Sequence, residues 1–246
     1  MQIIKIPRFK DERERRRTPD LILKDLKKNY EEFSRLSLEE IHLDNSKEKE
    51  ADKLIFENSK EEFEKQDRIF FIGGDESIEA QISKAFIESF KEKAFVFICA
   101  KPNIRLLQNL LEHVDKSKIY LIGLRNLNLK EKDFLQKTNI KIFSDGFNLE
   151  AGMDFIMEKI RKEDSLIFLN LNVLDPAFAP NVLNSEPGGM STRELFYILR
   201  RIGFLQNMRG FCLYGVDGEK DEKQGGKTIS VASRSLNILL GNYSKK

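Results

Sequence analysis

Short apolar runs rich in Ile, Phe, Val and Leu recur along the chain, separated by stretches with helical spacing. Apolar runs without polar alternation are typical of parallel strands that are buried on both faces. The pattern predicts up to eight strands, at Ile3–Ile6, Ile41–Leu43, Ile69–Ile72, Phe95–Ile98, Ile119–Ile122, Ile140–Phe143, Leu166–Leu171 and Phe211–Tyr214.

Apolar residues at helical spacing, together with capping residues, predict helices between these strands. Strands that alternate with helices indicate an α/β fold with a mainly parallel sheet. Residues 45–67 are rich in charge and are interpreted as a solvated helix or a linker. The predicted helices are one that opens at Thr18-Pro19-Asp20 and carries Leu23, Leu26, Tyr30 and Phe33 on one face, one capped by Ser77, and others over Ile104–Leu111, Phe155–Ile160, Ser191–Ile202 and Ser230–Leu240.

The composition excludes several classes of protein and of functional site. The 246 residues correspond to about 1.6 average domains, and the net charge of +2 argues against a strongly basic nucleic-acid scaffold. The chain has only two His, His42 and His113, and only two Cys, Cys99 and Cys212, which excludes a His-rich metal site and a disulfide framework. Without an 18-residue apolar run or a signal-peptide core in Met1–Pro7, we expect a cytoplasmic protein without a membrane helix.

Two local signals have both a structural and a functional interpretation. Arg8–Arg17 holds six basic and three acidic residues. It could bind phosphate groups, but the interleaved acids favour a solvated segment, so a nucleic-acid partner is not expected. Cys99 lies near Lys101, but no His is close to it in sequence, which favours a small core residue over an activated thiolate.

The most specific signal lies between the last two predicted strands. Asn172-Val173-Leu174-Asp175-Pro176-Ala177-Phe178-Ala179-Pro180 is followed by Glu186-Pro187-Gly188-Gly189-Met190-Ser191-Thr192-Arg193-Glu194. Pro and Gly fix a tight path here from a strand end to a helix start. This segment resembles the ureohydrolase superfamily of arginase, agmatinase and formimidoylglutamase, in which an S-x-D-x-D strand end precedes VLDPAFAPG and PGGLT-x-RE.

The resemblance continues from about residue 68 to the C-terminus and is looser over residues 1–67. It implies one arginase-like domain over residues 1–246, built as a three-layer α/β/α sandwich around an eight-stranded parallel sheet. Family active sites lie at the carboxyl ends of the strands and hold two Mn²⁺ ions, which bind the hydroxide that attacks a guanidino or formimino carbon. The matching segments are Phe71–Ser77 with the family's GGDHS, Phe97–Asn103 with D-A-H-x-D, Ile122–Arg125 with IGxR and Gly210–Asp217 with GxDxxExN.

The chain departs from the family at every metal ligand. The His of GGDHS corresponds to Glu76, and the ligands of D-A-H-x-D correspond to Cys99, Lys101 and Asn103. The two Asp of S-x-D-x-D correspond to Asn170 and Asn172, and the substrate-recognising Glu to Gly215. The resemblance also implies that the substrate loop after D-A-H-x-D is missing, because Asn103 leads directly into a predicted helix.

The charges of these positions argue against metal binding. In the family, four carboxylates balance two Mn²⁺ ions, whereas here Glu76 and Lys101 cancel. An ammonium group at a ligand position repels a divalent cation. We therefore expect no metal and no other cofactor, and no catalytic residue among these positions. We also expect Lys101 to fill the former metal cavity and to bond Glu76 and the nearby amides.

Four functions remain. The sequence favours a non-catalytic ureohydrolase-like protein that acts as a binding, assembly or regulatory subunit, as a homo-oligomer or with a partner protein. The second is a metal-dependent C–N hydrolase of a guanidino or formimino compound with an unusual site built on Glu76 and Cys99. The third is a sensor whose cavity accepts a small molecule, and the fourth is nucleic-acid binding through Arg8–Arg17.

Overall fold

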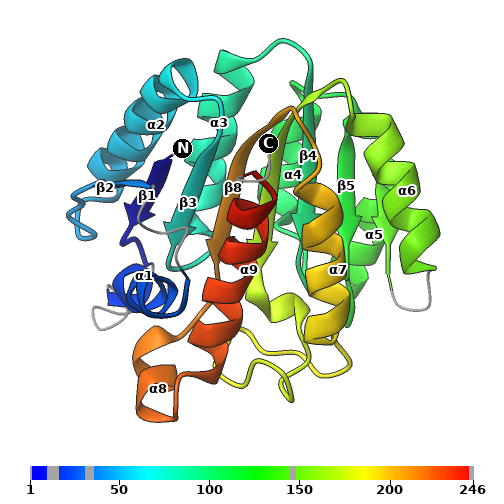
Figure 1. The fold of residues 1–246 in the computed structure, drawn as a ribbon. Coiled ribbons are helices and arrows are strands. Elements are labelled where there is room, and N and C mark those ends of the chain that lie inside the picture. The colour runs from blue at the N-terminus through cyan, green and yellow to red at the C-terminus, as the bar shows by residue number, and fades with distance from the viewer. Residues whose placement is uncertain (1, 10–16, 31–35, 145–147, 244–246) are drawn as a thin grey trace.

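The computed structural model describes residues 2–9, 17–30, 36–144 and 148–243. Within these residues, eight parallel strands form one sheet in the order β2-β1-β3-β8-β7-β4-β5-β6 (Figure 1). Its first two strands come from the loosely matching N-terminal third. The strands are β1 (Gln2–Ile6), β2 (Ser37–Glu40), β3 (Ile69–Gly73), β4 (Lys93–Ile98), β5 (Ile119–Ile122), β6 (Lys141–Phe143), β7 (Asp164–Asn170) and β8 (Met208–Tyr214).

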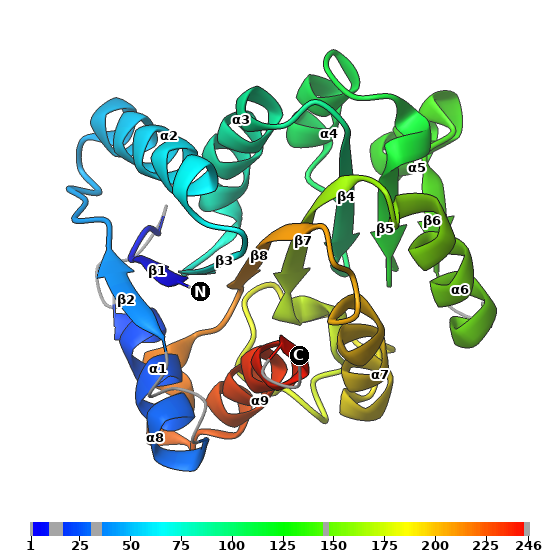
Figure 2. The same ribbon diagram turned by 45° about the horizontal axis from the view of Figure 1, so that its top comes forward.

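Helices cover both faces of the sheet, so the three-layer α/β/α sandwich is confirmed (Figure 2). α8 (Gly218–Lys223) lies beyond the carboxyl ends of the strands (Figure 1). None of the helices in the described ranges is long and apolar enough to cross a bilayer. One face is covered by α1 (Thr18–Asn29), α6 (Leu149–Ile160), α7 (Thr192–Ile202) and α9 (Lys227–Tyr243), and the other by α2 (Glu48–Lys65), α3 (Glu79–Ser89), α4 (Ile104–Leu111) and α5 (Leu129–Thr138).

The central strands are continuous apolar runs because both of their faces are buried. In β3, Phe70 and Ile72 enter the core under α1 and α9, whereas Ile69 and Phe71 enter the core under α2 and α3. All four side chains are fully buried. Successive side chains of a strand point to opposite faces, so a strand between two helical layers has no polar face.

Two N-terminal predictions need correction. The second strand runs over Ser37–Glu40 and not over Ile41–Leu43, although the buried Ile41 still donates its N–H to the carbonyl of Lys5. β2 is an edge strand with a largely exposed, polar sequence, so the apolar-run criterion does not find it. Residues 45–67 hold α2, in agreement with the helix interpretation, but this helix is not wholly solvated, because it buries Ala51, Ile55 and Phe63.

Capping residues explain where the helices begin. The predicted capping box at Ser191 and Glu194 is present at the start of α7. Ser77 does not cap a helix: Asp75 accepts the Ser77 N–H and opens a 3-10 helix, Glu76–Ile78, that leads into α3. Thr18 begins α1, but its hydroxyl accepts the N–H of Gly218. Phe33, which we placed on the same helix, lies outside the described residues.

Candidate functional site

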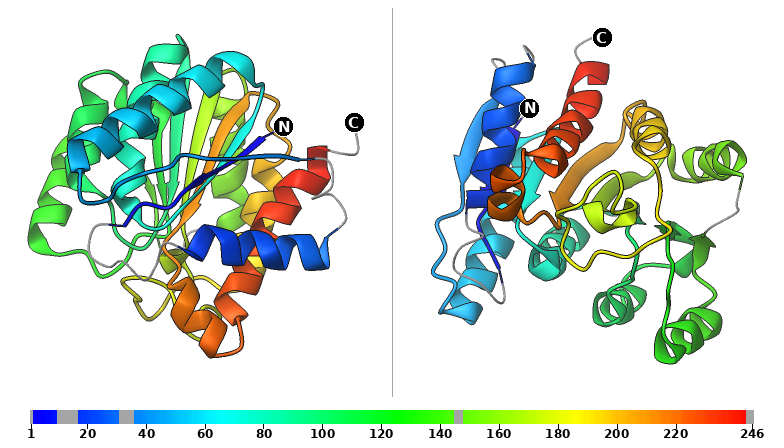
Figure 3. Two further views of the ribbon diagram at one scale, coloured as in Figure 1. Left: turned by 90° about the vertical axis from the view of Figure 1, so that its left-hand side faces the viewer. Right: turned by 90° about the horizontal axis from the view of Figure 1, so that it is seen from below.

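The positions singled out by the motifs lie at the carboxyl edge of the sheet. Glu76 follows β3, Cys99 follows β4, Asn170 ends β7 and Gly215 follows β8. The right-hand panel of Figure 3 looks onto this edge, which the long connection from β7 to α7 crosses. Open parallel sheets bind their ligands at this edge.

Asn170 and Asn172 are buried, and each side chain accepts a hydrogen bond from a backbone N–H group. Oδ1 of Asn170 accepts the N–H of Asn172 at 3.1 Å, and Oδ1 of Asn172 accepts the N–H of Ala100 at 3.0 Å. These bonds fix the turn after β7 and tie it to the end of β4. The two amide oxygens therefore satisfy buried backbone donors, which are costly to leave unpaired.

Gly215 lies against Asn170. Its φ is +87°, and a Cβ built on it would lie 2.2 Å from Oδ1 of Asn170. A side chain here would need both a left-handed backbone and the displacement of the Asn170 amide. The position of the family's substrate-recognising Glu is thus closed to any side chain while Asn170 keeps its place.

A buried carboxyl group that sequence reasoning missed lies beside these positions. Glu79, in the first turn of α3, is 4% exposed. One of its oxygens accepts the hydroxyl of Tyr214, and the other accepts Nδ2 of Asn103 at 2.8 Å. Asn103 also caps α4, because its Oδ1 accepts the N–H of Leu106. The three side chains form one hydrogen-bonded unit, the Glu79 cluster, that joins α3, β8 and α4.

Burial dominates the electrostatics of the Glu79 cluster. It raises the pKa of Glu79 to about 7, against the opposing effect of the bonds from Tyr214 and Asn103. The sequence could have indicated that Glu79 is buried, because its spacing places it on the same helix face as three other residues. Glu79, Ile82, Ser83 and Phe86 share the buried face of α3. A carboxylate on such a stripe indicates a buried polar contact.

The expected placement of Lys101 is wrong. Its ammonium group lies 2.5 Å from Oε1 of Glu186, in the connection from β7 to α7, and its side chain is 41% exposed. Glu186 also accepts Nδ2 of Asn126, and its bond to Lys101 lowers the pKa of its carboxyl group. Lys101 therefore does not fill the cavity or bond Glu76, because a carboxylate at the surface of this edge is within its reach.

Glu76 and Arg8 line a separate hollow of about 310 Å³, with Asp52 of α2 and Asn103. Arg8 is buried, and its guanidinium lies 2.8 Å from the carboxylate of Asp52. The first residue of the Arg8–Arg17 segment is thus part of a structural ion pair between the end of β1 and α2. Residues 10–16 of that segment lie outside the described residues.

The cysteines belong to the core, as predicted for Cys99. Cys99 and Cys212 are both free and both buried among the apolar side chains under α3 and α4. Burial raises the pKa of each thiol, so neither is a thiolate at neutral pH.

The retained motif residues hold the connection from β7 to α7. The guanidinium of Arg125 is buried and donates to the carbonyls of Asn172 and Glu186, both at 2.7 Å, and to that of Val173 at 2.9 Å. Asp175 accepts the N–H groups of Ala177, Gly188 and Gly189, which lower the pKa of its carboxyl group.

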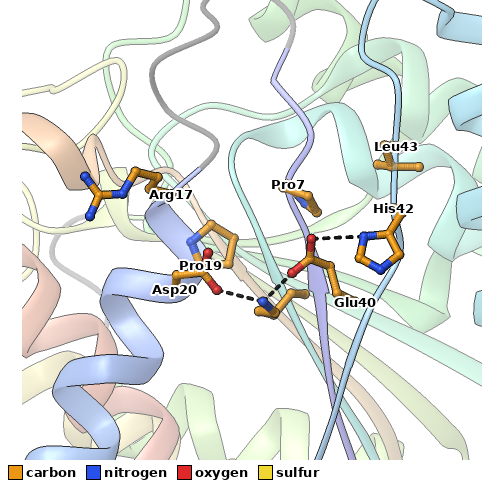
Figure 4. Close-up of a pocket in the computed structure, with 8 residues that line it drawn as sticks. Pro7, Arg17, Pro19, Asp20, Glu40, His42 and Leu43 are labelled. Atoms are coloured by element: carbon orange, nitrogen blue, oxygen red, sulfur yellow. Dashed lines mark hydrogen bonds and ion pairs between the residues drawn. The ribbon is translucent and has the colours of Figure 1, made fainter.

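A smaller hollow of about 260 Å³ lies where β1 and β2 end (Figure 4). The carboxylates of Asp20 and Glu40 both point to the ammonium group of Lys5, and His42 lies 3.3 Å from Glu40. Burial works against the charge of Lys5, but the two carboxylates raise its pKa above the usual value. One ammonium group thus bridges two carboxylates from different elements, so we interpret the group as a tie between β1, β2 and α1.

The sequence profile of the arginase family matches residues 13–240, which is most of the chain. This chain belongs to the arginase family. It is similar to an arginase of Brucella melitensis, with 26% identity over 134 residues, and to proclavaminate amidinohydrolase of Streptomyces clavuligerus, with 29% identity over 138 residues. These matches cover 52% and 54% of the chain but only 43% of each relative, so the chain matches less than half the length of these curated relatives.

The arginase-family fold extends over the whole chain. The solved structure of proclavaminate amidinohydrolase from Streptomyces clavuligerus superposes with a TM-score of 0.86. The superposition covers 99% of this chain and 91% of that one, at 22% identity. At this identity the superposition shows the shared fold.

The residues of this arginase-family chain do not fit the two Mn²⁺ ions that the resemblance implies. Divalent cations of this kind take carboxylate oxygens or neutral imidazoles. The corresponding positions here carry amides that already accept backbone N–H groups, a buried thiol, an ammonium group and a single carboxylate, that of Glu76. Within the described ranges, no three His, Cys, Asp or Glu side chains gather closely enough to hold a metal ion.

Proposed function

We propose that this chain is a non-catalytic member of the arginase family that acts as a binding, assembly or regulatory subunit. The observation that carries the proposal is the use of the former ligand positions as structural hydrogen-bonding groups. Asn170 and Asn172 hold the turn after β7, and Asn103 caps α4 while it binds Glu79. Each of these amides thus has a hydrogen-bonding role in the fold.

The closed site supports the same proposal. Gly215 leaves no room for the carboxylate that would recognise a guanidinium group, because Asn170 occupies that space. The carboxyl group of Glu79 is buried and is enclosed by Tyr214 and Asn103. A substrate with a guanidino or formimino group would therefore find no carboxylate at position 215.

The alternative, a metal-dependent C–N hydrolase with an unusual site, requires Glu76 and Cys99 to share a metal ion. Cys99 is buried and its thiol pKa is raised, whereas Glu76 lines the hollow beside Arg8 and Asp52. Two such ligands rarely hold a catalytic metal.

Assembly with other chains is part of the proposal. The resemblance implies trimers or hexamers, so we propose a homo-oligomer or a complex with an active member of the family. We propose that it acts in the cytoplasm, which is consistent with two free, buried cysteines. Sedimentation velocity tests the assembly: a single-chain species at every concentration would contradict a homo-oligomer.

The catalytic part of the proposal is tested by product release. The protein is incubated with Mn²⁺ and then with arginine, agmatine or formiminoglutamate, and urea and ammonia or formamide are measured, with a known arginase as the positive control. We expect no product above the protein-free control. Turnover that disappears in Glu76→Ala but persists in the matched surface variant Glu88→Ala would overturn the proposal and support the hydrolase.

A further inference from the structure

A lysine-lined hollow lies at the amino edge of the sheet, opposite the candidate functional site. Its volume is about 360 Å³, and its walls include Lys116, Lys118, Lys141, Lys159 and the ring of Phe155. Lys116 and Lys118 precede β5, and Lys141 begins β6. Phe155 and Lys159 lie on α6. In Figure 1 this is the upper edge of the sheet, beside β5 and α6.

Two carboxylates balance only part of this charge. Lys118 forms an ion pair with Glu163. Asp115 begins the turn before β5, where hydrogen bonds from Ser117 lower the pKa of its carboxyl group and the charges of Lys116 and Lys118 lower it further. These contacts leave an excess of positive charge at the hollow.

The excess positive charge of the hollow lies largely on Lys141 and Lys159. Their ammonium groups lie 5.2 and 5.6 Å from the centroid of the same ring, that of Phe155, and neither has an ion-pair partner among the described residues. A single ring thus holds two cations close to each other. Phe155 is 37% exposed, so neither lysine stem covers the ring fully.

Like charges that converge from three elements favour an anion that can lie between them. Ammonium groups on flexible stems bind phosphate as point charges, and each phosphate offers several acceptor oxygens. One phosphate group carries at most two negative charges at neutral pH, so it would not balance the three ammonium groups of Lys116, Lys141 and Lys159 beyond the Lys118–Glu163 pair. The geometry favours a ligand with several linked phosphates.

We propose that this hollow binds a small anion with at least two phosphate groups, held by Lys116, Lys141 and Lys159. The anion is either a free polyphosphate or the phosphate tail of a nucleotide, since both present the same chemistry to the lysines. The proposal does not depend on the loss of catalysis at the opposite edge.

Calorimetric titration tests the proposal, with tripolyphosphate and ATP as separate probes in buffer with about 0.15 M salt. We expect one saturable site per chain. The double variant Lys141→Met and Lys159→Met, which keeps the length of the stems, should weaken binding at least tenfold (about 1.4 kcal/mol). The matched double variant Lys27→Met and Lys28→Met, on α1 at the other end of the sheet, should change it less than about twofold.

The two probes distinguish the sources. Equal affinity for tripolyphosphate and ATP assigns the site to the phosphates alone. Tighter ATP binding that Phe155→Leu abolishes assigns it to a nucleotide whose base contacts the ring. Equal weakening in both double variants, or no saturable binding at about millimolar probe, would overturn the proposal, and thermal melts confirm that every variant is folded.

Discussion

Glu79 places a carboxyl group inside an apolar core, and its neighbours determine the free energy of its ionisation. Burial favours the neutral form, whereas the bonds from Tyr214 and Asn103 favour the charged form. Burial dominates, so the pKa rises from 4.5 to about 7. Protonation of this one residue therefore couples folding to pH between about 4.5 and 7.

The raised pKa predicts a stability that falls as pH rises. The unfolded chain loses this proton near pH 4.5 and the folded chain near pH 7, so the folded state binds more protons between these values. The contribution of Glu79 is present below about pH 4.5 and lost by about pH 7, and amounts to about 3 kcal/mol.

Urea unfolding across this range, in the natural protein and in Glu79→Gln, measures the effect. The variant should lack the downward trend, and the difference between the two proteins should grow as pH rises. Glu76→Gln, a change in the same segment at a partly exposed carboxylate, is the matched control. A difference that stays constant with pH would contradict the buried titration.

Gly215 gives the second prediction at the residue scale. Gly215→Ala forces a left-handed Ala and drives its Cβ into Oδ1 of Asn170, so it should destabilise the fold by about 2–4 kcal/mol in thermal or urea unfolding. Gly225→Ala is the matched control, because Gly225 has a φ of +96° and no atom near its Cβ position. It should cost only about 1 kcal/mol of backbone strain.

A double variant separates the clash from the strain. Asn170→Ala shortens the side chain that Cβ of residue 215 meets, so Gly215→Ala should cost less in that background. Equal costs in the two backgrounds would show that Asn170 does not close this position.

At the scale of elements, the connection from β7 to α7 depends on Arg125. Its guanidinium satisfies carbonyls on both sides of the connection, at Asn172, Val173, Leu174, Glu186 and Pro187. This explains why an otherwise irregular stretch of chain crosses the sheet edge in one path. The same stretch carries Glu186, the partner of Lys101.

Arg125→Met should remove the guanidinium donor from these carbonyls, of which that of Val173 keeps another donor, the N–H of Met190, and should destabilise the fold by at least about 3 kcal/mol. Hydrogen exchange should then speed up at the amides of Gly188 and Gly189, which Asp175 holds. The exposed Arg105→Met, on α4, is the control and should change stability by less than about 0.5 kcal/mol. Unchanged exchange in Arg125→Met would contradict this role.

Sequence reasoning found the central strands because burial on both faces leaves a continuous apolar run. It misplaced β2, where one edge meets solvent and the strand reads Ser-Leu-Glu-Glu. It did not predict α5, whose start is marked by a capping box of Asn128 and Glu131 but whose sequence buries only Leu135. Helices with little buried surface give a weak periodic signal.

At the scale of the whole molecule, the motifs predicted which residues meet at the sheet edge, because the order of strands carries that information. They did not predict which contacts those residues make. Lys101 pairs with Glu186, 85 residues away in the sequence, and Asn103 binds Glu79, 24 residues away. Tertiary packing determines both partners. Local sequence motifs therefore predict the arginase fold, whereas they do not predict the hydrogen bonds at the positions of the family's metal ligands.

We infer that the former ligand positions hold the fold together and do not hold metal. The most direct test is the metal content of the purified protein after incubation with excess Mn²⁺ and desalting, measured by inductively coupled plasma mass spectrometry. We expect less than about a tenth of an equivalent of any transition metal per chain. One or two equivalents of Mn²⁺, lost in Glu76→Ala, would contradict it.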